Sequence, residues 1–154
     1  MTLETARAWL AANAPDLSVI EVDQSTATVA EAAAALGVAP GRIAKTLALR
    51  LNDRSVLVVA AGDTRLDNAK CKIVFGTRPR MLDTDEAFKI TGHPVGGVCP
   101  FGLATPIPVY CDLSIKRFDP VYPAAGSLTS SVRVSPDRLA ALVGAEWIDI
   151  CRLG

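Results

Sequence analysis

The sequence is poor in histidine and lacks the cysteine spacings of metal sites. It contains one histidine and four cysteines, and no two cysteines are spaced as Cys-x-x-Cys. Structural zinc sites take four ligands from cysteine and histidine in such short motifs. One histidine cannot complete the usual zinc sets, so we expect no structural metal.

Long apolar runs and a net charge are missing as well. The longest apolar runs, such as residues 56–61, are far shorter than the roughly 20 residues that span a bilayer. The N-terminus has no basic region followed by an apolar run, so we expect no secretory signal and a cytoplasmic protein with reduced thiols. The zero formal net charge argues against an extended nucleic-acid binder, which normally carries a basic excess.

The charge is nevertheless unevenly distributed. Residues 42–80 contain nine basic and three acidic side chains. One interpretation is a solvated surface with ordinary salt bridges. The other is a basic patch that meets a few phosphates of an RNA in a weak, salt-sensitive contact.

The residues that are present predict one α/β domain. The chain has 154 residues, half of them hydrophobic, which suits a single hydrophobic core. An apolar helical face that ends at Pro15 predicts a helix over residues 2–14. Helix-capping residues and terminating glycines predict helices over residues 28–36, 68–75, 83–92 and 136–143. Alternating or continuous apolar runs predict strands over residues 17–22, 46–51, 55–61, 80–82, 107–112, 120–125, 131–134 and 147–151. This pattern favours a curled mixed sheet with helices outside.

A glycine-rich loop at residues 91–102 is the first candidate site. It holds four glycines, two prolines and the only histidine. Gly96-Gly97 allows another molecule to approach the main chain closely, and the prolines fix the backbone on either side. The amides from Gly96 to Cys99 would then suit an anionic or carbonyl oxygen. The alternative is a tight crossover turn packed under a neighbouring strand.

Lys45 is the second candidate, at the entrance to a predicted buried strand. A lysine in this position can extend its ammonium to water. It can instead hold the ammonium over a pocket, where it would pair with phosphate or stabilise a developing oxyanion. The sequence leaves both interpretations open.

Cys99 and His93 offer a possible nucleophile and base. They lie six residues apart in the glycine-rich loop, so a thiol–imidazole pair is conceivable. In that case the protein would be a thiol hydrolase. The alternative is that Cys99 is a small loop residue and His93 a turn or pocket-wall residue.

Two further polar positions remain ambiguous. Asp112 ends an apolar strand, where an acid can orient a basic group or a substrate amine, although a turn-forming aspartate is the alternative. Gly126-Ser127 and the nearby Ser131 form a polar tip that either faces the same pocket or belongs to a plain hairpin turn.

Taken in order, these motifs resemble the bacterial YbaK/EbsC family of aminoacyl-tRNA deacylases. The family includes free-standing relatives of the editing domain inserted in bacterial prolyl-tRNA synthetase. The resemblance covers residues 17–151. It is carried by five motifs: Lys45-Thr46-Leu47; Ala61-Gly62-Asp63 with Arg65-Leu66-Asp67; Thr91-Gly92 followed by Gly96-Gly97-Val98-Cys99-Pro100-Phe101-Gly102; Asp112; and Ala125-Gly126.

The resemblance implies hydrolysis of the ester between a mischarged amino acid and the terminal ribose of tRNA. It implies a single editing domain over residues 1–154, with a mixed, barrel-like sheet surrounded by helices. No cofactor, metal or protein nucleophile is implied. Water or a group on the substrate attacks, while fixed dipoles stabilise the charge on the carbonyl oxygen.

The resemblance also assigns residues. The family's essential lysine matches Lys45, and its Gly-x-x-x-Pro loop matches Gly96 to Pro100, so we expect catalytic roles for Lys45, Gly96 and Gly97. The expected substrate-binding residues are Thr46, His93, Val98, Cys99, Pro100, Asp112, Gly126, Ser127 and Ser131.

The chain departs from the family where amino-acid specificity is concerned. The family often has serine where this chain has Cys99, and the position of Ser131 varies. Because a pocket gains only about 1–3 kcal/mol per methylene, editing enzymes specialise by excluding larger groups. Our first expectation is alanine and our second is cysteine, on proline tRNA, with prolyl-tRNA synthetase as a possible partner and no membrane or DNA. The alternatives are a non-catalytic aminoacyl-tRNA or synthetase binding module and the Cys99/His93 thiol hydrolase.

Overall fold

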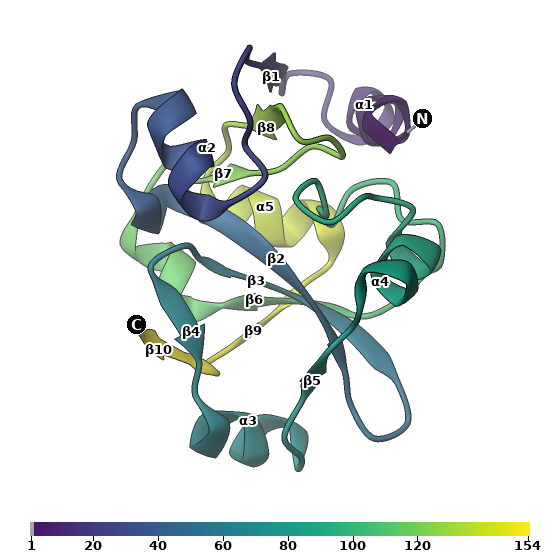
Figure 1. The fold of residues 1–154 in the computed structure, drawn as a ribbon, viewed down its shortest axis with the longest axis vertical. Helices are drawn as coiled ribbons and strands as arrows, with labels where there is room; N and C mark the ends of the chain where they lie inside the picture. Colours follow the sequence, from purple (N-terminus) through teal and green to yellow (C-terminus); the bar gives the residue numbers. More distant parts are fainter. Residues whose placement is uncertain (1) are drawn as a thin grey trace.

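The computed structural model describes residues 2–154, and its helices alternate with short strands (Figure 1). The helices are α1 (Thr2–Asn13), α2 (Val29–Leu36), α3 (Asn68–Phe75), α4 (Thr84–Thr91) and α5 (Pro136–Val143), with 3-10 turns η1 (Pro40–Arg42) and η2 (Leu113–Arg117). The strands are β1 (Val19–Glu21), β2 (Ile43–Arg50), β3 (Ser55–Ala61), β4 (Thr64–Leu66), β5 (Arg80–Met81), β6 (Val109–Asp112), β7 (Tyr122–Pro123), β8 (Ser130–Val132), β9 (Glu146–Ile148) and β10 (Cys151–Leu153). No helix in this part of the chain is long and apolar enough to cross a membrane.

The helix ends follow the predicted capping chemistry. Four helices begin after a residue whose side chain accepts a backbone N–H of the first turn, namely Thr28, Asp67, Asp83 and Ser135. The same helices end at a glycine in the left-handed conformation: Gly37, Gly76, Gly92 and Gly144. These caps satisfy backbone groups that a helix cannot pair internally, so short helices start and stop where the sequence indicates.

A six-stranded mixed sheet forms the centre of the molecule. Its order is β5-β2-β3-β6-β9, and β7 pairs with β2 on the side away from β3. β2 and β3 form an antiparallel hairpin, whereas β6, β9 and β7 run parallel to their neighbours. All seven residues of β3 are buried, as the continuous apolar run predicted for a central strand.

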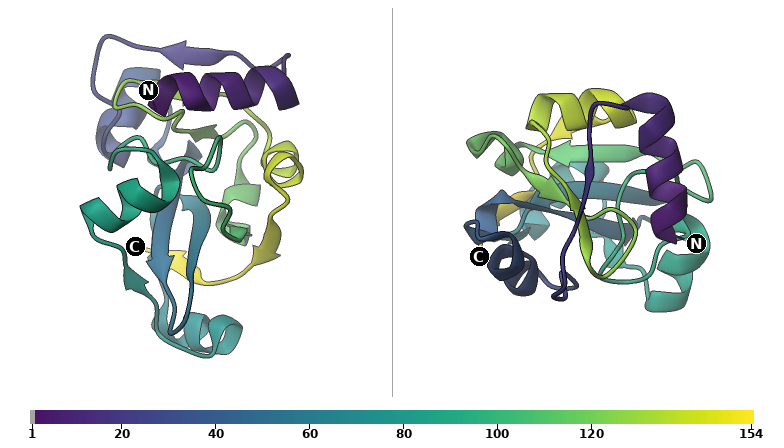
Figure 2. Two further views of the ribbon diagram at one scale, coloured as in Figure 1. Left: turned by 90° about the vertical axis from the view of Figure 1, so that its right-hand side faces the viewer. Right: turned by 90° about the horizontal axis from the view of Figure 1, so that it is seen from above.

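Helices cover both faces of this sheet (Figure 2). The larger hydrophobic cluster combines buried residues of α1, α4 and α5 with Ala44 and Ala48 of β2. A smaller cluster on the other face combines Leu49 with buried residues of α3 and of the C-terminal strands. Successive residues of β2 therefore serve different faces, because side chains alternate along a strand.

The mixed α/β arrangement is confirmed, but the described strands close no barrel. They form the open six-stranded sheet and two separate pairs, β1-β8 and β10-β4. The strand predicted over residues 147–151 is also divided into β9 and β10. The N–H of Ile150 donates to Asp112 at 2.8 Å, and its carbonyl accepts the N–H of Asp67 at 2.8 Å. These bonds carry the chain from β6 across to β4 and so interrupt the predicted strand.

Candidate active site

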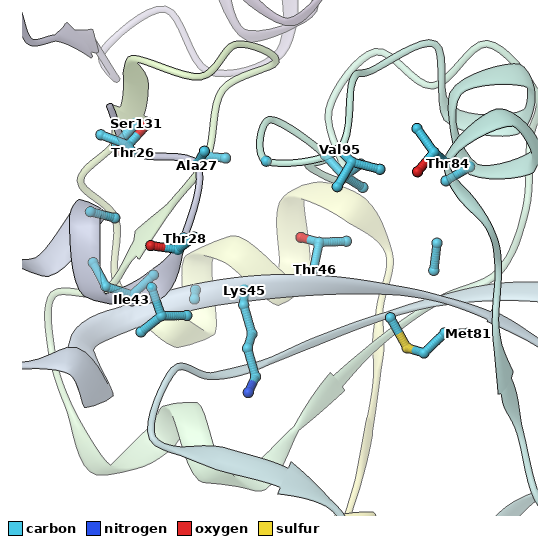
Figure 3. Close-up of a pocket in the computed structure, with 18 of the residues that line it drawn as sticks. Thr26, Ala27, Thr28, Ile43, Lys45, Thr46, Met81, Thr84, Val95 and Ser131 are labelled. Carbon is cyan, nitrogen blue, oxygen red and sulfur yellow. The ribbon is translucent and has the colours of Figure 1, made fainter. Parts of the chain in front are cut away.

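A cavity of about 380 Å³ lies beside β2, between the start of α2 and the start of α4 (Figure 3). This volume falls within the range typical of small-molecule sites. Five segments form its walls: residues 26–32, residues 43–48 of β2, residues 81–87, the glycine-rich loop and the β7–β8 region. Most of the lining side chains are small or apolar, so the few polar groups there fix what the cavity can recognise.

The edge of β2 that faces the cavity is unpaired at its centre. The Gly62 N–H donates to Ile43 and the Leu51 N–H to Arg54, so odd-numbered residues of β2 exchange hydrogen bonds with β3. Even-numbered residues therefore turn their backbone groups the other way. On that side β7 pairs with residues 43–44 and β5 with residues 49–50, while the Ala48 carbonyl accepts the Leu82 N–H. On this side no described strand pairs with Thr46, so the sheet does not use its N–H and carbonyl.

The glycine-rich loop approaches from the opposite wall and is held by close backbone packing. Gly96 has a φ of 93°, and a Cβ there would lie 2.7 Å from Leu128 and 2.9 Å from Ala27. A Cβ on Gly97 would lie 2.8 Å from the Ser127 backbone. Both positions therefore require glycine for packing within the chain, which is the tight-turn alternative, while approach by another molecule stays a prediction.

The loop amides divide into free and engaged groups. Gly96 and Val98 line the cavity, and within residues 2–154 their N–H groups have no hydrogen-bond partner. The Gly97 N–H donates to the Pro94 carbonyl at 2.9 Å, so it closes the turn and is not free to hold an oxyanion. Two unpaired amides at one wall, rather than four in succession, are what the loop offers to a carbonyl oxygen.

Lys45 lines the cavity, but its ammonium group lies on the opposite side of β2. The residue lines the cavity, but Figure 3 shows its side chain leaving β2 on the side opposite Thr46 and Val95. Its ammonium donates to the Thr64 carbonyl. Burial lowers the pKa of Lys45, and the nearby carboxylate of Asp63 acts in the opposite direction. The expected convergence of this ammonium and the loop amides is therefore absent in this structure.

Two threonine hydroxyls beside the cavity have no hydrogen-bond partner. Thr26 and Thr46 both line the cavity, and the Oγ1 atom of each is buried and unpaired within the described residues. A buried hydroxyl without a partner costs on the order of 1–3 kcal/mol. Such groups are uncommon in folded proteins, and a ligand that supplied the missing bonds would recover this energy.

His93 and Cys99 lie together, but away from the cavity. His93 is fully buried, its Nε2 lies 2.7 Å from the Phe101 carbonyl, and the Cys99 Sγ lies 3.5 Å from the same nitrogen. Because a carbonyl only accepts, Nε2 carries the proton and cannot act as a base toward the thiol. Burial also raises the pKa of the Cys99 thiol to about 12. This pair ties the loop together and provides no thiolate.

Asp112 is a structural carboxylate in this arrangement. It is buried and lies outside the cavity lining. Its Oδ2 accepts the Ser114 N–H at 2.9 Å, where it caps η2, and its Oδ1 accepts the Ile150 N–H at 2.8 Å. Both oxygens are therefore occupied: Oδ2 caps η2, and Oδ1 joins β6 to the C-terminal segment.

The polar tip after β7 supports the loop. The Gly126 N–H donates to the Gly97 carbonyl at 3.1 Å, and Ser127 bonds to Ser130 at 2.7 Å. Of the residues predicted from the sequence, the structure brings five to the cavity: Lys45, Thr46, Gly96, Val98 and Ser131. Seven lie outside its lining: Gly97, His93, Cys99, Pro100, Asp112, Gly126 and Ser127.

Sequence reasoning missed two other walls of the cavity. Thr26 and Thr28 belong to the segment that leads into α2, and Thr28 also accepts the Glu31 N–H as the helix cap. Met81 and Thr84 come from β5 and the first turn of α4. The capping signals of both helices were visible, and helix starts commonly flank a ligand site, but nothing in the sequence showed that these two starts face each other. Within residues 2–154, no His, Cys, Asp or Glu side chains form a group of three that could hold a metal.

Comparison with known proteins shows which family this chain belongs to. The model of the aminoacyl-tRNA editing domain matches residues 23–142. The chain belongs to the aminoacyl-tRNA editing domain family. The resemblance predicted from the motifs is thereby confirmed. Every residue that lines the cavity, from Thr26 to Ser131, falls inside the matched segment of this editing domain.

Relatives of the editing domain occur as free-standing chains and as parts of synthetases. The chain is 43% identical to the uncharacterized protein YwhH of Bacillus subtilis (strain 168), over 99% of this chain and 98% of the relative. It is 39% identical to a segment of the proline--tRNA ligase of Moorella thermoacetica, over 57% of this chain but only 15% of the ligase. A crystal structure of a candidate trans-editing enzyme for prolyl-tRNA synthetase superposes with a TM-score of 0.90 at 32% identity, covering 98% of this chain and 97% of the other.

Proposed function

We propose that this protein is a trans-editing aminoacyl-tRNA deacylase that hydrolyses the ester of a small mischarged amino acid, alanine or cysteine, on proline tRNA. The residues 1–154 would act as one editing domain in the cytoplasm, where tRNA is charged. The observation that carries the proposal is the coincidence of the editing-domain match with every segment that lines the cavity.

The free groups of the cavity suit an aminoacyl ester. The Gly96 and Val98 amides can hold the ester carbonyl oxygen, on which negative charge develops during hydrolysis. The Thr46 carbonyl, on the unpaired edge of β2, can accept a hydrogen bond from the α-ammonium group. Water or a hydroxyl of the terminal ribose would then attack the carbon held between these groups.

Lys45 suits a phosphate better than the oxyanion. Its main chain lines the cavity, while its ammonium lies on the far side of β2 beside Thr64. A phosphate of the tRNA 3′ end that passes this side of β2 would meet a cation that needs no movement across the strand. The lysine would then bind and position the substrate rather than stabilise the transition state directly.

The same position of Lys45 favours a second candidate function. A domain whose lysine is turned away from the ester can hold an aminoacyl-adenosine end or a synthetase without turnover. This candidate shares every motif with the deacylase, so only a measurement of hydrolysis separates the two.

The test is a panel of misacylated tRNAs with wild type and Lys45→Ala. The proposal predicts hydrolysis of Ala-tRNA or Cys-tRNA by the wild type. If Lys45 holds a phosphate, the variant raises KM roughly tenfold, equivalent to about 1.4 kcal/mol, and leaves kcat within a few-fold of wild type. A large fall in kcat with unchanged KM assigns the lysine to the oxyanion instead. Equal kinetic constants would remove Lys45 from the mechanism.

A control separates the deacylase from the binding module. The wild type is titrated with a non-hydrolysable aminoacyl-adenosine analogue. Binding of this analogue, together with no hydrolysis of any tRNA in the panel, would overturn the deacylase and favour the binding module.

A further inference from the structure

One end of the molecule is formed by the β2–β3 turn and the α3–β5 connection. Both lie at the bottom of Figure 1, and the side view in Figure 2 places them at the same end. The Thr77 hydroxyl in the connection donates to the Asn52 side-chain oxygen in the turn at 3.2 Å. Two segments whose bonded residues are 25 positions apart in the sequence are thus fixed side by side here.

Five exposed basic residues belong to the turn, to the connection or to the elements that adjoin them, β2, α3 and β5. We call them the basic end: Arg50, Arg54, Lys72, Arg78 and Arg80. Arg80 pairs with Glu86 at 3.3 Å, and Arg50 reaches only the Ser55 hydroxyl at 3.5 Å. Among residues 2–154, no carboxylate pairs with Arg54, Lys72 or Arg78. The turn itself adds one acid, Asp53, so positive charge is in excess.

The pairing of β2 with β5 brings two of these cations together. Arg50 and Arg80 are directly opposite each other in the antiparallel register. Like charges at directly opposed positions destabilise a strand pair. Among the described residues Glu86 is the one carboxylate that pairs with either arginine, and an external anion would offset the charge that remains.

We propose that the basic end binds phosphates of the acceptor arm of the tRNA whose 3′ end enters the cavity. This inference rests on the proposed function. β5 connects the two places, because Arg80 belongs to the basic end and the next residue, Met81, lines the cavity. A polyanion whose end occupies the cavity would meet the basic end at Arg80, one residue from the cavity wall, and its phosphates match the charge there.

Acidic residues at the first turn of α4 mark the boundary of this surface. Asp83 accepts the Glu86 N–H at 2.8 Å, and Glu86 accepts the Asp83 N–H at 3.3 Å. Glu86 also pairs with Arg80. Two of the three acids there, Asp85 being the third, are thus engaged with backbone amides or with Arg80. The uncompensated positive charge lies on the side of the β2–β3 turn.

The experiment measures the affinity of an uncharged acceptor-stem RNA by fluorescence anisotropy over a series of KCl concentrations. The test variant is Arg54→Gln/Arg78→Gln, which removes two exposed side chains that have no protein partner. The matched control is Lys89→Gln/Arg133→Gln, which removes the same charge from exposed positions elsewhere. A third variant, Asp53→Asn, removes the acid from the turn.

We expect the test variant to bind at least about tenfold more weakly near 0.1 M salt, because two counterion-releasing contacts are lost. The slope of log affinity against log salt should fall by about two. The control should keep both values, and Asp53→Asn should bind severalfold more tightly. The proposal would be overturned if the test variant kept the affinity and slope of the wild type, or if the control lost as much affinity. An acidic protein surface would then be the better partner for the basic end.

This outcome is independent of catalysis. RNA binding that depends on Arg54 and Arg78, without hydrolysis of any misacylated tRNA, would contradict the deacylase and keep the binding surface. Hydrolysis of aminoacyl-tRNA, together with an RNA affinity that does not depend on Arg54 and Arg78, would support the deacylase and contradict the binding surface.

Discussion

His93 lies in the glycine-rich loop, and its ring bonds to that loop rather than lining the cavity. Its Nε2 donates to the Phe101 carbonyl, while its Nδ1 is buried and has no partner. Burial lowers the pKa of His93 below its ordinary value. The neutral ring fits this environment, and a second ring proton would find no acceptor there.

This gives a pH-dependent stability. Because the folded-state pKa is depressed, the unfolded chain binds the proton more strongly. The contribution of neutral His93 to the free energy of unfolding is therefore fully present above the unfolded-state pKa of about 6.5. It is lost as pH falls from there toward the lower pKa of His93 in the folded protein. We expect the free energy of unfolding, measured with urea, to fall between pH 7.5 and pH 5.5 for wild type.

The matched variant is His93→Gln, whose amide can still donate to Phe101 but does not titrate. It should be less stable than wild type at pH 7.5, by about 1–2 kcal/mol, and should show little change over this range. Parallel pH curves for the two proteins would contradict the account of His93.

At the scale of elements, Asp112 decides how the C-terminal strands are arranged. Its two oxygens accept the N–H groups of Ser114 and Ile150, and the second bond is what separates β9 from β10. The carboxylate is buried with both acceptors occupied.

Asp112→Asn tests this role. An asparagine oxygen can accept one of the two N–H groups, but its NH₂ group faces the other donor, so one buried amide is left unpaired. We expect a loss of about 1–3 kcal/mol in the free energy of unfolding, measured by urea denaturation, with kcat for the best misacylated tRNA unchanged at a temperature where the variant is folded. A stable variant with a greatly reduced kcat would instead indicate that Asp112 acts on the substrate.

The elements also show what the sequence could predict. Helix ends were predictable because capping is local: Asp83 and Glu86 act within one turn, and Gly92 ends the helix they start. The buried β3 was predictable from its continuous apolar run. The path of the chain at Ile150 was not, because it depends on a contact with Asp112, 38 residues away.

The same contrast holds for the cavity. The glycine-rich loop could be singled out because Gly96-Gly97 permits close backbone approach, and Lys45 lies in the cavity lining, while its catalytic role stays a prediction. The direction of its ammonium was not predictable. It depends on which face of β2 the odd-numbered residues take, and only the pairing with β3 and the two hydrophobic clusters fix that. Thr26 was missed because its burial results from packing between distant segments.

On the scale of the whole molecule, the basic residues of positions 42–80 do not form one surface. Arg42 and Lys45 bond to carbonyls of Pro120 and Thr64, near the cavity. Arg54 and Arg78 lie at the far end with no carboxylate partner among the described residues. The cavity and the excess positive charge thus lie at different places. A long anionic substrate that places only its reacting end in the cavity would contact both.

The central claim is that an aminoacyl-adenosine group occupies the cavity beside the unpaired edge of β2. The most direct measurement is an amide chemical-shift titration of ¹⁵N-labelled protein with a non-hydrolysable aminoacyl-adenosine analogue. We predict saturable shifts at the amides of Thr46, Gly96 and Val98, and little change at those of Asp112 and Ile150. Shifts confined to residues away from this cavity, or none at millimolar ligand, would contradict the account.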